Sequence, residues 1–120
     1  MKKPIGLVCL SLFISLLPTI LIAQIEVPTQ DEFFEIIRTE GADKGEEIFS
    51  QVRKVYPDTL FFSENDMNLL GYEFMFQDRL DEAIVVFRLN IEAYPNAWNV
   101  YDSMGEAYMH NNKKEKAIIL

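Results

Sequence analysis

Histidine and cysteine, which often serve in acid–base and metal chemistry, are scarce in this chain. It contains one histidine, His110, and one cysteine, Cys9. Zinc sites use three or four Cys, His or carboxylate ligands at suitable spacing, and no second histidine can join His110. The acidic pairs Glu46-Glu47 and Asp81-Glu82 occupy consecutive positions, which suits solvated faces or helix starts better than a general acid–base couple. We therefore expect no catalytic residue, metal or cofactor, and a His110 that lies at a helix end.

The first 23 residues have the layout of a secretory signal peptide. Two lysines precede an uncharged run from Pro4 to Ala23. The last residue of the run is small, which suits cleavage before Gln24. The alternative is an uncleaved membrane anchor, because residues 5–23 nearly reach the length that spans a bilayer. We expect an exported protein, periplasmic or secreted, with anchoring through residues 5–23 as the alternative.

Without that leader the chain is strongly acidic. Removing Lys2 and Lys3 from the 11 basic residues leaves 9 against 19 acidic ones, a net charge of −10. Nucleic acids and anionic lipids would be repelled, so we expect no nucleic-acid partner and membrane contact only through an uncleaved leader. Since Cys9 lies in the leader, disulfides cannot stabilise the remainder, which must rely on packed helices.

Helix signals fill the rest of the chain. Thr29 and Glu32 have the capping-box pattern that begins a helix, and Gly41 is expected to end it. Turns are expected at Gln77-Asp78 and at Asn111-Asn112. The expected helices cover residues 30–40, 43–55, 64–76, 80–94 and 97–110, with the start of another over 113–120.

Part of the segment from Met67 to Pro95 recurs at an offset of 34 residues. Leu70-Gly71 returns as Met104-Gly105, Phe74 as Tyr108, and Ala83 as Ala117. This period, with small and aromatic positions, is typical of stacked helix-turn-helix repeats. The predicted fold class is all-α, with antiparallel helix pairs stacked in a short solenoid.

Two glycines lie inside predicted helices and need a structural reason. Glycine in a helix interior costs about 1 kcal/mol relative to alanine, yet Gly71 and Gly105 recur at the repeat offset. Antiparallel helices pack with their axes about 8–10 Å apart, and a residue without bulk permits the closest approach. We expect Gly71 to face Ala83, while Phe74 and Phe87 fill the wider part between the helices.

The pattern resembles the tetratricopeptide repeat (TPR) family. The positions that carry the resemblance are Leu70, Gly71, Phe74, Ala83, Phe87 and Pro95, then Tyr101, Met104, Gly105, Tyr108 and Ala117. Met67 and Asn90 depart from it, because an aromatic and a small residue are usual there. The resemblance implies a degenerate TPR-like helix pair (30–63), a TPR unit (64–97) and a truncated second unit (98–120), which follow the predicted signal peptide (1–23) and a linker (24–29).

The chain is also similar to the C-terminal TPR tail of exported bacterial serine hydrolases of the beta-lactamase type. The similarity covers the run from Asn68 to Met109 and the upstream stretch FFEIIRTEGADKGEEIFSQVRKVYPDT. The catalytic Ser-x-x-Lys motif of that class is absent, since Ser50, Ser63 and Ser103 are followed three residues later by Arg, Asp and Glu. An alternative function is therefore an accessory or remnant tail of such a hydrolase, without its catalytic domain.

The TPR resemblance implies ligand binding in a concave groove lined by the first helix of each pair. The groove positions are Asn68, Tyr72, Met75, Phe76, Asn99, Asp102, Glu106 and Met109. They would form an acidic, partly aromatic groove for a protein or peptide partner of basic or amphipathic character. The alternative is that Tyr72 and Met75 merely contact the neighbouring repeat, because such helical stripes usually form core.

Apolar residues 118–120 would form the inward face of a helix of about two turns. Repeat proteins usually need a polar terminal cap and three or more units for stability and solubility. We therefore expect self-association through the open C-terminal end, or a low melting temperature.

Overall fold

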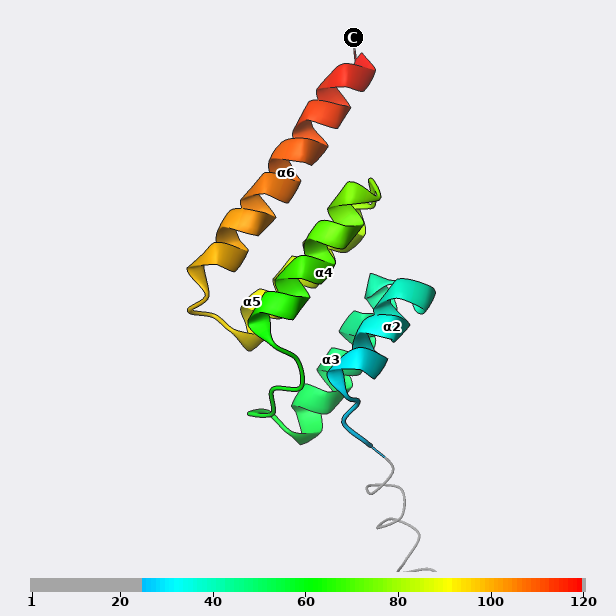
Figure 1. The fold of residues 1–120 in the computed structure, drawn as a ribbon, viewed down its shortest axis with the longest axis vertical. Helices are drawn as coiled ribbons and strands as arrows, with labels where there is room; N and C mark the ends of the chain where they lie inside the picture. Colours follow the sequence, from blue (N-terminus) through cyan, green and yellow to red (C-terminus); the bar gives the residue numbers. More distant parts are fainter. Residues whose placement is uncertain (1–24, 120) are drawn as a thin grey trace, which may run out of the picture.

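The computed structural model describes residues 25–119 and is all-α over that range (Figure 1). Its helices are α2 (Gln30–Glu40), α3 (Ala42–Val55), α4 (Glu64–Phe76), α5 (Leu80–Ala93) and α6 (Trp98–Ile119). At residues 115–119 the helix is described but the side chains are not. The predicted signal peptide, residues 1–23, lies outside the described residues.

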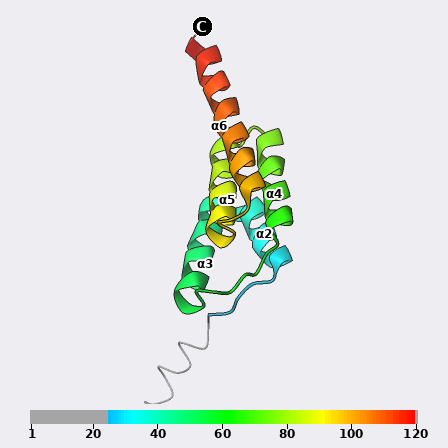
Figure 2. The same cartoon turned by 90° about the vertical axis from the view of Figure 1, so that its left-hand side faces the viewer.

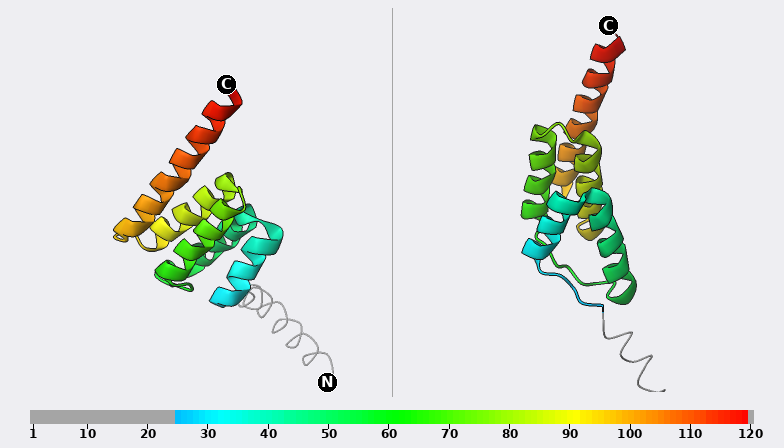
Figure 3. Two further views of the ribbon diagram at one scale, coloured as in Figure 1. Left: turned by 45° about the horizontal axis from the view of Figure 1, so that its top comes forward. Right: turned by 90° about the vertical axis from the view of Figure 1, so that its right-hand side faces the viewer.

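The helices form two layers. α2 and α3 make a first hairpin, and α4 and α5 make a second. Figures 2 and 3 show α2 and α4 in one layer and α3 and α5 in the other. The two hairpins meet mainly through α3 and α5. α6 packs on the second hairpin, mostly against α5 and less against α4.

Local sequence signals place several helix ends as predicted. The Thr29 hydroxyl accepts a hydrogen bond from the Glu32 N–H, and the Glu32 carboxylate accepts one from the Thr29 N–H, which completes the capping box. Gly41 ends α2 with a φ of 102°, a conformation that favours glycine. Gln77 and Asp78 form the turn after α4, and Asp78 has a φ of 60°.

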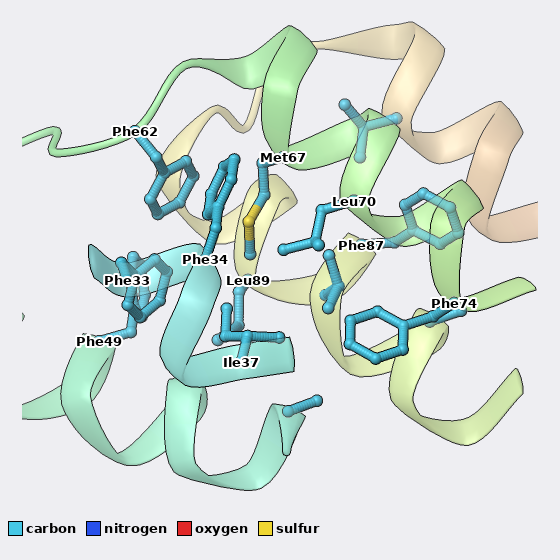
Figure 4. Packing of buried hydrophobic residues seen from close by; sticks show 14 of the residues in the cluster. Phe33, Phe34, Ile37, Phe49, Phe62, Met67, Leu70, Phe74, Phe87 and Leu89 are labelled. Atoms are coloured by element: carbon cyan, nitrogen blue, oxygen red, sulfur yellow. The ribbon is translucent and has the colours of Figure 1, made fainter. Parts of the chain in front are cut away.

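Aromatic rings join the two hairpins in one core, shown in Figure 4. The ring centroid of Phe62 lies 5.7 Å from that of Phe33 on α2 and 6.1 Å from that of Phe49 on α3. On its other side, Phe62 lies 6.1 Å from Tyr94, which follows α5. Since Phe62 belongs to the connector between the hairpins, that connector supplies a central core residue.

Two polar contacts fix the start of α4 against the end of α5. The Tyr94 hydroxyl donates a hydrogen bond to the Phe62 carbonyl, and burial, with the nearby Glu64 charge, raises the pKa of Tyr94. The fully buried Asn90 donates from Nδ2 to the Glu64 carbonyl at 2.9 Å. Asn90, a departure from the TPR pattern, therefore ties the two helices of the second hairpin together.

Glu82 of the second hairpin caps a helix of the first. Its carboxylate accepts a hydrogen bond from the Ala42 N–H at 3.2 Å, at the start of α3, where Gly41 offers no side chain to do so. Arg79 donates two hydrogen bonds of 2.8 Å to Glu82, and these lower the pKa of the carboxyl. Glu82 lies in the first turn of α5, as expected, but it is a structural contact and not merely a solvated charge.

Gly71 makes room for an aromatic ring. A Cβ atom at this position would lie 2.2 Å from Cε1 of Phe87. Both residues are buried between α4 and α5. The prediction that packing requires the missing side chain of Gly71 is therefore confirmed. The predicted partner is wrong, because the Phe87 ring, expected in the wider part, fills this space instead of Ala83.

α6 departs most from the sequence prediction. It runs through Asn111-Asn112 to Ile119, so the predicted turn there is wrong and His110 lies within the helix, not at its end. No glycine or proline interrupts residues 106–119, and the lysines, glutamate and alanine of 113–117 are good helix formers. Two asparagines followed by such residues do not end the helix, because the local preference of residues 113–117 continues it.

The repeat positions on α6 are correspondingly open. Tyr101 and Tyr108 are 49% and 48% exposed, whereas Phe74, the equivalent of Tyr108, is buried. No described heavy atom lies within 4 Å of a Cβ placed at Gly105. The predicted packing reason for Gly105 is therefore wrong for the part of the chain that the structure describes. The side chain of Ala117 lies outside that part.

Candidate interaction groove

An exposed apolar ridge runs along α4. Leu69 and Phe76 are 65% and 86% exposed, and seven residues are two helical turns, so both lie on one face. Tyr72 lies between them and stacks on Phe76, with ring centroids 6.3 Å apart. We call these three residues the α4 ridge. Tyr72 is half-buried, so the exposed apolar surface of the ridge comes from Leu69 and Phe76. Exposed apolar side chains that share a helix face form a candidate interaction surface.

α6 supplies one wall beside the α4 ridge. The Tyr72 hydroxyl donates a hydrogen bond of 3.1 Å to the Glu106 carboxylate. Asp102 and Met109 are exposed, and residues three, four and seven apart share a helix face, so both lie on the Glu106 side of α6. Five of the predicted groove residues, Tyr72, Phe76, Asp102, Glu106 and Met109, thus occupy adjoining faces of α4 and α6.

The other three predicted groove residues are half-buried. They are Asn68, Met75 and Asn99. Met75 packs against the hydrophobic core, and so does the half-buried Tyr72, whose ring centroid lies 5.6 Å from that of Phe87. Such packing is the alternative considered for both residues. The Asn99 carbonyl accepts a hydrogen bond from the Ser103 hydroxyl, and Asn68 Oδ1 is buried without a hydrogen-bond partner among the described residues. These side chains contact neighbouring protein more than solvent.

The opposite wall comes from α2, which contains none of the predicted groove positions. A hollow of about 450 Å³ lies between α2 and α4 and is lined by Gln30, Phe34, Arg38, Asp66, Leu69, Leu70 and Glu73. Gln30 donates to Asp66 at 2.9 Å, and Arg38 donates to Glu73 at 3.1 Å two turns further along. Leu69 is shared by this hollow and the α4 ridge. The groove therefore extends across α2, α4 and α6.

Carboxylates flank the α4 ridge on both sides. Hydrogen bonds from Ser63 and Gln30 lower the pKa of Asp66, which keeps this carboxyl ionised at neutral pH. Glu73 is on the same side but is paired with Arg38. Asp102 and Glu106 flank the ridge on the α6 side. The groove thus joins an apolar centre to an acidic rim.

Among residues 25–119, no three His, Cys, Asp or Glu side chains are grouped so that they could hold a metal ion. No helix within the described range is both long and apolar enough to cross a membrane. Comparison with models of protein families gave no match, nor did comparison with curated proteins or with solved structures. The TPR resemblance therefore depends on the residues of this chain alone.

Proposed function

We propose that this chain is an exported, non-enzymatic TPR-type module that binds a protein or peptide segment along the α4 ridge. The leader pattern of residues 1–23 supports export, and the 34-residue recurrence supports a TPR-type helical stack. The observation that carries the proposal is the exposure of Leu69 and Phe76, 65% and 86%, on one face of α4.

The partner is a basic, amphipathic segment. Its apolar side chains would cover Leu69 and Phe76, and its lysines or arginines would lie near Asp66, Asp102 and Glu106. Such a segment gains apolar burial at the centre and charge attraction at the rim. The acidic rim disfavours acidic segments, because like charges would be brought together.

The affinity of this contact is expected to be modest. Burying a Leu or Phe side chain is worth about 1.5–3 kcal/mol each, and much of that gain is offset by the lost freedom of the partner. Two such anchors supply about 3–6 kcal/mol before that offset, so with screened rim charges the dissociation constant is expected on the order of millimolar. Because salt screens the attraction between the rim and the partner, binding should weaken as the salt concentration is raised.

Two synthetic peptides test the proposal by fluorescence anisotropy. The two peptides have the same length and the same apolar residues. The polar face carries lysines in one peptide and glutamates in the other. The lysine peptide should bind, and Phe76→Ala should weaken it at least tenfold. Tyr56→Ala, which removes an aromatic that is 41% exposed outside the groove, should leave binding unchanged. Equal binding of both peptides, or no effect of Phe76→Ala, would overturn the proposal.

Charge reversal at the α6 wall gives an independent test. Glu106→Lys replaces an acidic rim residue with a basic one and removes the acceptor of the Tyr72 hydroxyl. We expect weaker binding of the lysine peptide with unchanged helix content by circular dichroism. Undiminished binding would exclude the α6 wall from the groove.

A further inference from the structure

A second exposed stripe lies on α6, beside the groove face. Trp98, Tyr101 and Tyr108 are 74%, 49% and 48% exposed. With Gly105 they follow steps of three, four and three residues, which place side chains along one seam of a helix. We call these four residues the α6 stripe. Three large aromatic residues around a glycine suit contact with another helix.

The second hairpin indicates what kind of helix fits this stripe. At Gly71 the missing side chain admits the ring of Phe87, whose Cε1 would lie 2.2 Å from an added Cβ. Gly105 holds the same position 34 residues later, and the space beside it is open among the described residues. The stripe therefore fits a helix that brings an aromatic ring to Gly105.

The charges of α6 favour α6 of a second copy. Asp102 and Lys113 are both exposed, and their separation of eleven residues is close to three full turns, so they lie on the same side of the helix. When two such helices run antiparallel, Asp102 of each copy faces Lys113 of the other. The stripe itself supplies the rings, because this register places each Tyr108 within one turn of Gly105 in the other copy.

We propose that two copies of this chain pair as an antiparallel, two-fold symmetric dimer in which the Gly105–Tyr108 ends of the two α6 stripes meet. A two-fold contact uses the same surface on both copies, as the paired aspartate and lysine require. One helix face covers less than the roughly 800 Å² per partner of a standard interface, so the dissociation constant is expected in the micromolar range. The dimer and the peptide groove share Asp102, but sedimentation without any peptide measures the dimer alone, so failure of one proposal can be told from failure of the other.

Sedimentation equilibrium of the full chain, from about 1 to 100 μM, tests the dimer. The wild type should be dimeric at the upper end, and Gly105→Arg should weaken dimerisation at least tenfold by placing bulk and charge at the centre of the stripe. His110→Arg is the matched control, since His110 is exposed on α6 outside the stripe. It should leave the dissociation constant unchanged.

Charge exchange tests the antiparallel register. Asp102→Lys alone brings two lysines together, and Lys113→Asp alone brings two aspartates together, so each should weaken the dimer about tenfold. The double exchange restores opposite charges and should return the dimer towards wild-type strength. Helix content by circular dichroism should be the same in all variants. A parallel pair would not show this rescue.

Several outcomes would overturn the proposal. A wild type that stays monomeric at 100 μM would show that another partner, or no partner, covers the stripe. Association that Gly105→Arg does not change would place the contact elsewhere, such as the apolar residues 5–23. Dimers weakened by both single charge changes but not rescued by the double exchange would exclude the antiparallel arrangement.

Discussion

Gly71 is the residue at which a single methyl group has the clearest expected cost. An added Cβ would lie 2.2 Å from the Phe87 ring, so Gly71→Ala must displace a buried side chain. We expect a loss of about 1–3 kcal/mol in the free energy of unfolding, typical of overpacked cores. Urea denaturation measures it, and adding Phe87→Leu to the variant should recover part of the loss.

Gly105→Ala, at the equivalent position of α6, is expected to raise the free energy of unfolding, not to lower it. The space there is open among the described residues, so alanine gains helix propensity without a clash. The free energy of unfolding should rise by about 0.5–1 kcal/mol, measured at a dilution that leaves the chain monomeric. A loss as large as that of Gly71→Ala would show that Gly105 is packed within one copy.

Glu82 should make stability depend on pH in the acidic range. Hydrogen bonds from Arg79 lower its pKa in the folded state, so its contribution is complete above the pKa of an unfolded glutamate, about 4.3. It is lost as pH falls through the lowered folded-state value. Glu82→Gln should therefore cost about 1 kcal/mol at pH 7, and the difference from wild type should shrink steadily as pH falls below about 4.3.

Glu47→Gln is the control for this measurement. Glu47 pairs with Lys44 at 3.3 Å on the exposed face of α3, and both side chains are at least two-fifths exposed. Such pairs contribute little to stability. Urea titrations across this pH range should show no difference from wild type, whereas a Glu82→Gln cost that does not shrink as pH falls would exclude the ionic contribution.

At the scale of the helix, the sequence predicts ends that depend on local signals. Thr29, Gly41 and Gln77-Asp78 act on their own neighbours, and the structure agrees with each. Asn111-Asn112 carries no comparable stop, because asparagine is tolerated inside a helix and the following residues favour one.

Asn112→Ala tests the continuity of α6. Asn112 is exposed within the helix, and alanine has the higher helix propensity by about 0.5 kcal/mol. Helix content, followed by the ellipticity at 222 nm, and the melting temperature should rise slightly. A fall in either would indicate that Asn112 forms a turn in solution.

The groove could be predicted only in part. Tyr72, Phe76, Asp102, Glu106 and Met109 were accessible to prediction because the resemblance to the TPR family implies a groove lined by the first helix of each pair. The wall formed by α2 was not, because that helix matches the repeat poorly and its distance from α4 depends on the packing of α3 against α5. Hollows between helices are set by such long-range contacts and not by local pattern.

For the whole molecule, Phe62 is expected to be the most sensitive position outside the helices. It is 5% exposed and contacts rings from both hairpins, so Phe62→Ala should cost about 3–5 kcal/mol. Because native domains are stable by only about 5–15 kcal/mol, this variant should unfold at much lower urea. Leu60→Ala, in the same connector but 52% exposed, should have little effect.

The importance of Phe62 could not be recognised from the sequence, because adjacent phenylalanines in a connector have no helical period to assign them to a face. Its ring unites the hairpins, so they should unfold in one transition. Circular dichroism and tyrosine absorbance should give the same midpoint. Two separate midpoints would show that the hairpins fold independently.

Trp98 is the single tryptophan of the chain and stands 74% exposed at the start of α6. Its indole is therefore a built-in optical reporter for the stripe on which it lies. In the isolated monomer its emission should be red-shifted and readily quenched by iodide. Shielding by any occupant of that stripe should move the emission to shorter wavelength and protect the ring, without an attached dye.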